Sequence, residues 1–215
     1  MLKLPGYIVV EGPIGVGKTT LARRLANHYG SDLILEGADE NPFLPKFYEN
    51  PKGAALAAQL FFLFQRIEQI KSLSQGDMFN PVRVADFLLE KDRLFAELTL
   101  TEDELKLYDQ VYSGMAIDAP VPDLVIYLQA PVEILLQRIK KRGIEHEQGM
   151  DADYLKRLCE AYIQFFYQYK NAPLLIVNAT EVNFAEGEED FAMLLSQITE
   201  LPKGVTYFNQ MTSFS

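Results

Sequence analysis

The sequence of 215 residues has little of what marks secreted, membrane-spanning or nucleic-acid-coating proteins. Its single cysteine, Cys159, excludes an intrachain disulfide and a zinc site built from several cysteines. No apolar run approaches the roughly 20 residues that a membrane-spanning helix needs. Basic residues number 20 against 30 acidic ones, and the net charge of −10 argues against binding to nucleic acid or to a membrane surface.

The first residues also do not read as a signal peptide, because Glu11 interrupts the apolar run too early. There is no internal repeat and no low-complexity segment. With 48% apolar and 23% charged residues, the composition is that of an ordinary soluble globular protein. The length favours one domain over residues 1–215. We therefore expect a cytoplasmic protein, in which a small anionic ligand would need a locally basic pocket.

Short apolar runs alternate with longer segments of helical period along the chain. The runs predict five buried strands: Gly6–Glu11, Asp32–Glu36, Pro81–Phe87, Asp123–Leu128 and Pro173–Asn178. Helices are predicted over Thr19–Tyr29, Gly53–Gln75 and most of Pro131–Lys170, and a capping signal stands at Thr101 and Glu104. Strands that are apolar throughout and separated by helices predict an α/β fold, with a five-stranded parallel sheet covered on both faces. Ligands of such sheets bind at the carboxyl ends of the strands.

A glycine-rich loop follows the first predicted strand. Its sequence GPIGVGKT matches G-x-x-x-x-G-K-[ST] in full and lies between a strand and a helix. The backbone N–H groups of such a loop face a phosphate, Lys18 can reach the outer phosphates, and the Thr19 hydroxyl can ligate Mg²⁺. A chance glycine-rich turn is the alternative. The motif predicts a nucleoside triphosphate and Mg²⁺, held by Gly12, Pro13, Ile14, Gly15, Val16, Gly17, Lys18, Thr19 and Thr20.

Acidic side chains stand at the ends of the second and third predicted strands. Glu36 ends one and Asp86 nearly ends the other, so both should face the crevice that holds the phosphate loop. A kinase that acts on a hydroxyl needs one carboxylate to take its proton and another acid beside the Mg²⁺. We expect Glu36 and Asp86 to supply these roles, and the alternative for each is that it caps a turn.

With these segments the chain resembles the deoxynucleoside kinases, specifically the bacterial deoxyadenosine, deoxyguanosine and deoxycytidine kinase branch. The resemblance extends from YIVVEGPIGVGKTT to the fifth predicted strand and includes the segment LEGADENPF. It implies a P-loop kinase fold with a helical lid, ATP as phosphoryl donor and a deoxynucleoside as acceptor. In the family, the glutamate of this segment acts on the nucleoside 5′-hydroxyl, which assigns the general base to Glu36.

A tyrosine, a glutamine and an arginine at the family's spacing follow in FYENPKGAALAAQLFFLFQR. Gln59 and Arg66 are two helical turns apart, so both project from one face of an apolar helix, where polar groups need a ligand or each other. The resemblance makes Gln59 the reader of the base, Arg66 a partner on the base side and Tyr48 a contact to the sugar 3′-hydroxyl. One of three phenylalanines could stack on the base, and we expect at least two to belong to the core or a dimer interface: Phe61, Phe62 and Phe64.

The third-strand segment departs from the family, whose members mostly have an acid-arginine-serine run followed by an Asp-Arg pair. This chain reads ADFLLEKDRLFAE, with Asp86 at the acid position and Phe87 where the arginine is expected. Either Lys91 or Arg93 could supply the missing cation. The later pair is kept, and the resemblance gives Asp92 a role in selecting the base, while Arg93 could equally form a surface ion pair.

The segment RIKKRGIEHEQG, Arg138–Gly149, places four cations in five positions. Arg138 and Arg142 share one helical face, and Gly143 is a candidate hinge. A solvated basic face is the ordinary explanation of such a run. We favour a lid whose arginines close over the transferring phosphates, as arginine fingers do in other phosphoryl-transfer enzymes.

The rest of the lid departs from the family at one position. Ile144 stands where the family often has a further arginine, whereas Glu147 matches the lid glutamate that contacts the 3′-hydroxyl through the tyrosine. His146 is expected to face solvent, and Cys159 to be a core thiol. The position of the loop Val177–Phe184 after the fifth strand suggests that it packs on the adenine of ATP.

The combined prediction is an ATP-dependent kinase of the 5′-hydroxyl of a deoxynucleoside, in nucleotide salvage. Resemblance to the bacterial branch favours a purine, deoxyadenosine or deoxyguanosine, and a homodimer formed through the helix Gly53–Gln75. A nucleoside monophosphate kinase is a competing interpretation, but it would need further cations for the acceptor phosphate. A nucleotide-dependent switch without catalysis is a second alternative, which Phe87 and Ile144 keep open.

Overall fold

A parallel sheet forms the centre of the computed structural model, which describes residues 5–74, 82–115, 119–182, 184, 187–200 and 203–208. The strand order is β2-β3-β1-β4-β5-β6, and every neighbouring pair is parallel. The strands are β1 Tyr7–Glu11, β2 Asp32–Ile34, β3 Arg83–Ala85, β4 Leu124–Gln129, β5 Leu174–Asn178 and β6 Val205–Phe208. The predicted α/β architecture is confirmed, with one strand more than expected.

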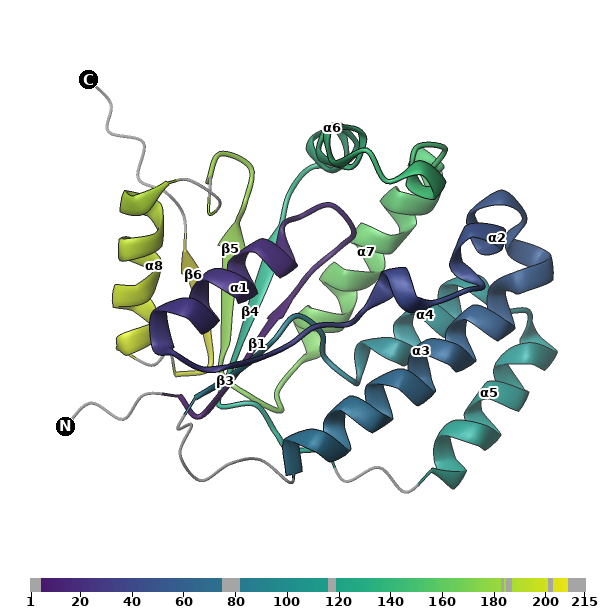
Figure 1. The fold of residues 1–215 in the computed structure, drawn as a ribbon, viewed down its shortest axis with the longest axis horizontal. Coiled ribbons are helices and arrows are strands. Elements are labelled where there is room, and N and C mark those ends of the chain that lie inside the picture. Colours follow the sequence, from purple (N-terminus) through teal and green to yellow (C-terminus); the bar gives the residue numbers. More distant parts are fainter. Residues whose placement is uncertain are drawn as a thin grey trace.

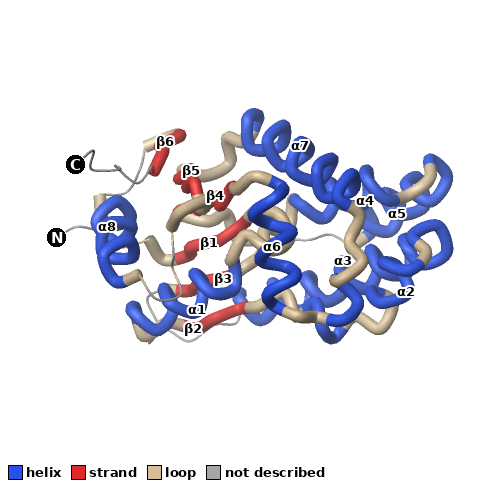
Figure 2. Tube along the Cα trace, turned by 90° about the horizontal axis from the view of Figure 1, so that it is seen from above, coloured by secondary structure: helices blue, strands red, loops and turns tan. Residues whose placement is uncertain are grey.

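Helices cover both faces of this sheet (Figures 1 and 2). They are α1 Lys18–Tyr29, η1 Ala38–Glu40, α2 Leu44–Glu49, α3 Pro51–Ser74, α4 Lys91–Thr99, α5 Glu102–Gly114, α6 Val132–Arg142, η2 Glu145–Glu147, α7 Ala152–Gln168 and α8 Glu188–Thr199. The helix α1 packs on β1, β2 and β3, and α7 lies across the sheet from it. The predicted helices over Thr19–Tyr29 and over most of Pro131–Lys170 are therefore confirmed, as is the one over Gly53–Gln75, whose last residue lies outside the described ranges.

The central strands are apolar throughout because helices enclose them from both sides. Leu124 to Leu128 in β4 and Ile8 to Val10 in β1 are all buried. The helix α7 presents one apolar face to the sheet, where the Phe166 ring stacks on that of Tyr127 with 4.2 Å between the centroids. Burial of each such side chain contributes about 1.5–3 kcal/mol, which fixes the sheet as a rigid platform for the loops at its carboxyl edge.

The sixth strand escaped the sequence prediction because it is an edge strand with a mixed surface. β6 pairs only with β5, and its residues Val205 and Tyr207 are exposed while Phe208 is buried. An edge strand needs no continuous apolar run, which was the signal that identified the other five. Its position next to β5 is far from the strand ends that carry the predicted acids.

A helical layer made of α2, α3, α4 and α5 lies to one side of the sheet (Figure 1). The helix α3 packs against the other three, and its Leu63 and Ile67 form a second core with Tyr108 of α5. The predicted capping box at the start of α5 is present, with Glu104 accepting a hydrogen bond from the backbone N–H of Thr101. None of the helices in the described ranges combines the length and apolar character that a membrane span requires.

Gly12, directly after β1, has a backbone conformation that a side chain would disturb. Its φ is 150°, and a Cβ atom there would lie 2.3 Å from the carbonyl oxygen of Leu128 in β4. We predict that Gly12→Ala lowers the free energy of unfolding by about 2–4 kcal/mol, because backbone must move apart to admit the methyl group. Urea denaturation measures the loss.

The matched control is Gly53→Ala in the first turn of α3. A Cβ there meets only the Asn50 side chain at 3.6 Å, so the substitution should raise the free energy of unfolding by about 0.5 kcal/mol. Equal stabilities of Gly12→Ala and the unsubstituted protein would contradict the tight approach of the loop to β4.

Candidate active site

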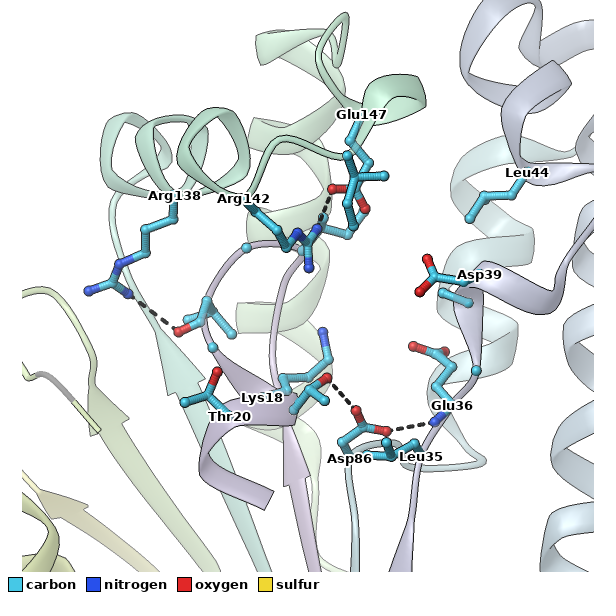
Figure 3. A pocket seen from close by; sticks show the side chains of 18 of the residues that line it. Lys18, Thr20, Leu35, Glu36, Asp39, Leu44, Asp86, Arg138, Arg142 and Glu147 are labelled. Carbon is cyan, nitrogen blue, oxygen red and sulfur yellow. Dashed lines mark hydrogen bonds and ion pairs between the residues drawn. The ribbon is translucent and has the colours of Figure 1, made fainter. Parts of the chain in front are cut away.

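A cavity of about 920 Å³ opens where β1, β2 and β3 end, at the edge of the sheet predicted to bind ligands (Figure 3). The phosphate loop and α6 form one half of its wall, and the segment Leu35–Asp39 with α2 and α3 forms the other. Its size is at the upper end of small-molecule sites, so it can hold a nucleotide together with a second small molecule.

The phosphate loop runs from Gly12 to Thr19 and leads directly into α1. Gly15 has a φ of 82°, and a Cβ atom there would lie 2.7 Å from Ile139 of α6, so the loop fits closely under the lid helix. The Lys18 ammonium donates hydrogen bonds to the carbonyls of Gly12 at 2.8 Å and Pro13 at 3.4 Å. The loop thus has the backbone and the cation that an anionic phosphate requires.

Lys18 is enclosed by the cavity walls although part of its side chain stays open to the cavity. Its pKa is lowered to about 8, first by burial and then by the neighbouring ammonium of Lys91, against the opposing carboxylates of Glu11 and Asp86. A phosphate bound beside Lys18 would favour the charged form again.

Asp86 joins the phosphate loop to the end of β2. Its Oδ2 accepts a hydrogen bond from the Thr19 hydroxyl at 2.5 Å, and its Oδ1 accepts one from the backbone N–H of Glu36 at 2.7 Å (Figure 3). Asp86 therefore fixes the position of Glu36 relative to the phosphate loop.

Thr19 and Asp86, the two residues predicted to hold Mg²⁺, are in contact with each other. The described residues contain no cluster of three or more acidic, histidine or cysteine side chains that could cage a metal. Magnesium usually keeps several waters and binds through one or two protein groups plus substrate phosphates. A hydroxyl and a carboxylate in contact beside a phosphate loop fit that chemistry.

Glu36 faces the cavity between two cations. Arg66 of α3 forms an ion pair with its Oε1, and the Lys91 ammonium lies 2.9 Å from the same oxygen. Among the described residues no donor contacts Oε2, so that oxygen is open to a ligand. Both cations are almost fully buried, with Arg66 2% and Lys91 1% exposed.

Arg66 also forms an ion pair with Asp92 of α4, which lies behind it and is not part of the cavity wall. Burial lowers the pKa of Arg66 to about 10, and the carboxylate of Glu11 opposes this. The guanidinium lies over the Phe62 ring at 4.9 Å, so Phe62 is the phenylalanine of the three that reaches the cavity, while Phe64 is 46% exposed.

Gln59 shares the cavity-facing side of α3 with Arg66, as their spacing predicted. It is only 4% exposed, and its amide donates a hydrogen bond of 3.3 Å to the Thr99 hydroxyl. An amide that is buried at a cavity wall has a donor and an acceptor for a ligand edge.

The lid meets α2 above this part of the cavity. Arg142 forms an ion pair with the buried Glu147, and the rings of Tyr48 and His146 stack with centroids 5.7 Å apart. The sequence analysis expected His146 to face solvent, but its ring stacks on Tyr48. Burial raises the pKa of Tyr48, and the nearby Tyr154 and Glu147 raise it further. Tyr48 and Glu147 thus lie in one neighbourhood, as expected.

The two predicted lid arginines reach different partners (Figure 3). Arg138 donates hydrogen bonds to the carbonyls of Val16 in the phosphate loop, at 3.3 Å, and of Ala179 after β5, at 2.7 Å. It thereby links the two loops, and the second of them contributes cavity wall where the adenine was expected: Glu181, Val182 and Phe184. The lid helix ends at Gly143, whose φ is 76°.

Glu11, the last residue of β1, is a site residue that sequence reasoning missed. Its carboxylate is fully buried and accepts hydrogen bonds from the backbone N–H groups of Gly12 and Leu88, both at 2.8 Å, and from the Tyr162 hydroxyl at 3.0 Å. The signal was present, because an acid that ends an apolar strand beside a phosphate loop follows the rule that identified Glu36 and Asp86.

The structure also shows where the two positions that depart from the family pattern lie, and where Arg93 lies. Phe87 is fully buried in the main core, and Ile144 lines the cavity. Arg93 lies outside the site, where its half-exposed side chain pairs with Glu97 at 2.9 Å and Asp109 at 3.3 Å.

Comparison with known proteins agrees with this geometry. A model of the family "Deoxynucleoside kinase" matches residues 8–203. A curated deoxyguanosine kinase of Bacillus subtilis (strain 168) is 36% identical over 201 residues, which cover 91% of this chain and 97% of the relative. A deoxyadenosine kinase of Lactobacillus acidophilus is 31% identical over 207 residues, covering 90% and 94%.

Solved structures show the same fold. The deoxyadenosine kinase from M. mycoides with bound dATP has a TM-score of 0.78 at 23% identity and covers 89% of this chain and 98% of its own. The same enzyme with dCMP and dCDP bound has a TM-score of 0.80 at 22% identity, covering 90% and 99%. The family match over most of the chain and the identities above 30% show that the chain belongs to the deoxynucleoside kinase family.

Proposed function

We propose that the protein transfers the γ-phosphoryl group of ATP to the 5′-hydroxyl of a purine deoxynucleoside, deoxyguanosine or deoxyadenosine, in nucleotide salvage. The observation that carries this proposal is the position of Glu36, which Asp86 ties to the phosphate loop while its free Oε2 faces the cavity. The names of the curated relatives, deoxyguanosine and deoxyadenosine kinases, favour a purine base.

The donor half of the cavity suits a triphosphate. The loop amides and Lys18 hold the outer phosphates, and Arg138 and Arg142 approach them from the lid. Thr19 and Asp86 would hold Mg²⁺, which supplies charge neutralisation at the phosphates. Positioning and charge stabilisation of this kind carry most of the catalysis in phosphoryl transfer.

The acceptor hydroxyl then reacts beside Glu36. Its proton passes to Oε2 as the bond from O5′ to the γ-phosphorus forms and the bond from that phosphorus to the bridging oxygen of ADP breaks. Asp86 places Glu36 within reach of the phosphate loop, and Arg66 with Lys91 keeps its other oxygen fixed.

The remaining wall would recognise the nucleoside. Gln59 offers its amide to the base edge, and Phe62 offers a ring face. We assign Arg66 to the base side, with Asp92 acting on the base through Arg66, since Asp92 does not line the cavity. Tyr48, with Glu147 beside it, is assigned to the sugar 3′-hydroxyl.

A monophosphate acceptor fits less well. The cations that contact Glu36 are Arg66 and Lys91, and both are already paired with carboxylates, while Arg142 of the lid pairs with Glu147. An acceptor phosphate beside Glu36 and Asp39 would therefore compete with carboxylates for these three cations. This favours an uncharged nucleoside.

We further propose that the protein acts in the cytoplasm, without a nucleic-acid or membrane partner, and as a homodimer formed through α3. The helix packs against α2, α4 and α5 but leaves Phe64 exposed, so an apolar side chain on it is available to a second copy.

The substrate prediction concerns the four common deoxynucleosides. With Mg²⁺-ATP, the purified protein should convert deoxyguanosine and deoxyadenosine to monophosphates with a higher kcat/KM than deoxycytidine and thymidine. Chromatography of the products measures each rate. Phosphorylation of a deoxynucleoside monophosphate, with none of the four nucleosides converted, would contradict the proposal.

The prediction for the general base concerns the variant Glu36→Gln. The amide cannot take the hydroxyl proton, so kcat should fall by about 10²–10⁴-fold while the Kd for ATP, from calorimetry, stays within about threefold. Glu49→Gln, an exposed glutamate at the end of α2, is the matched control and should leave both quantities unchanged. Equal losses of turnover and ATP binding in Glu36→Gln would count against the assignment.

The assembly prediction is a mass by light scattering of about twice the chain mass of 24.4 kDa. Phe64→Glu places a charge in the proposed contact and should shift the mass toward that of one chain. A monomeric mass for the unsubstituted protein would refute the dimer.

A further inference from the structure

The cation beside Glu36 comes from a position that the family pattern does not predict. Phe87, where an arginine is expected, is 0% exposed and belongs to the main core, so no charged group approaches Glu36 from there. Of the two candidates left open by the sequence, Arg93 faces outward and is paired on the surface. The other, Lys91, lies 2.9 Å from Glu36 Oε1.

Lys91 is held in this position by Glu11 and Phe95. It is the first residue of α4, and its ammonium lies 3.5 Å from Oε2 of Glu11 and 5.6 Å from the centre of the Phe95 ring. The same oxygen of Glu11 accepts the backbone N–H of Leu88, so the carboxylate anchors both the start of α4 and the ammonium. The contacts with Glu11 therefore fix the Lys91 side chain in an orientation that reaches Glu36.

The charge of Lys91 is shared between two carboxylates of different function. Glu11 is fully buried and Glu36 is exposed to the cavity. An ammonium has three donors and can serve both at once. Without the ammonium, Glu11 keeps its hydrogen bonds from Gly12, Leu88 and Tyr162 but loses its buried ion-pair partner, so the removal affects Glu11 as well as Glu36.

We propose that Lys91 is a positioning residue of the phosphoryl transfer, whose ammonium fixes Glu36 through Oε1, leaves Oε2 for the acceptor hydroxyl and supplies the charge that the arginine expected at Phe87 would supply. The proposal rests on the proposed function, because it assigns Glu36 the role of base. A purely structural Lys91, acting only on Glu11, is the competing explanation.

The pH dependence of turnover separates these explanations. Burial lowers the pKa of Lys91 to about 8, with Arg66 lowering it and Glu11 and Asp86 opposing. The charged and titratable groups around the ammonium are Glu11, Lys18, Glu36, Arg66 and Asp86. Lys18 also has a pKa of about 8, but bound ATP keeps it charged. Turnover at saturating ATP should therefore fall as the pH rises above about 8, when Lys91 loses its proton.

The experiment compares three variants of the full chain with the unsubstituted protein at saturating ATP and deoxynucleoside. Lys91→Met keeps the stem and removes the charge, and kcat should fall on the order of 10²-fold while KM for ATP stays within about threefold. Lys91→Arg keeps the charge, should retain more than a tenth of kcat, and should move the alkaline limb of the profile to higher pH. Arg93→Met, on the same helix turn, is the control and should match the unsubstituted protein.

Several results would overturn the proposal. They are a kcat of Lys91→Met within about threefold of the unsubstituted value, a loss in Lys91→Arg as large as in Lys91→Met, or an alkaline limb that Lys91→Arg does not move. If thermal unfolding shows that Lys91→Met is not folded, the kcat and pH profile of Lys91→Arg decide alone. Failure of the unsubstituted protein to phosphorylate any deoxynucleoside would instead refute the proposed function, which keeps the two failures distinct.

Discussion

The contacts of Asp86 hold the two halves of the cavity together. One carboxylate oxygen accepts from Thr19 at the end of the phosphate loop, and the other accepts from the backbone of Glu36 beyond β2. Since β1, β2 and β3 are parallel neighbours, their carboxyl ends already lie side by side. Asp86 converts that proximity into a fixed distance between the site for phosphates and the carboxylate proposed as base. The other residues of the cavity wall supply the charges and the shape of the site around Asp86.

Charge is distributed unevenly in the protein, and the site depends on that distribution. The chain carries a net charge of −10, yet four of its basic residues fall within Arg138–Arg142 of the lid and others converge at the carboxyl edge of the sheet. At the wall of the cavity, Lys91 and Arg66 form buried ion pairs with Glu11 and Asp92, which lie behind that wall. Removing one member of such a network leaves an unpaired buried charge, so its members depend on one another.

The sequence predicted the parts of the structure that local pattern determines. Apolar runs located β1 to β5, and the loop motif with the acids after β2 and β3 located the cavity. β6 was missed because its exposed residues break the apolar pattern. Glu11 could have been identified from its place at the end of an apolar strand, but its contacts with Leu88 and Tyr162, which are distant in sequence, could not. The choice between Lys91 and Arg93 depended on the orientation of α4: two residues on a helix point about 200° apart, so one faces the site and the other solvent. Only the packing of α4 against α3 and α7 determines which of the two residues faces the site.

The central claim is that the hydroxyl beside Glu36 is the 5′-hydroxyl of a deoxynucleoside and that it receives the γ-phosphoryl group. Phosphorus NMR of the reaction with ATP and deoxyguanosine tests it most directly, with 2′,5′-dideoxyguanosine as the matched analogue that lacks only this hydroxyl. The account predicts that ADP and deoxyguanosine 5′-monophosphate form in equal amounts and that the analogue is not phosphorylated. A phosphate ester on the 3′-oxygen, or phosphorylation of the analogue, would contradict it.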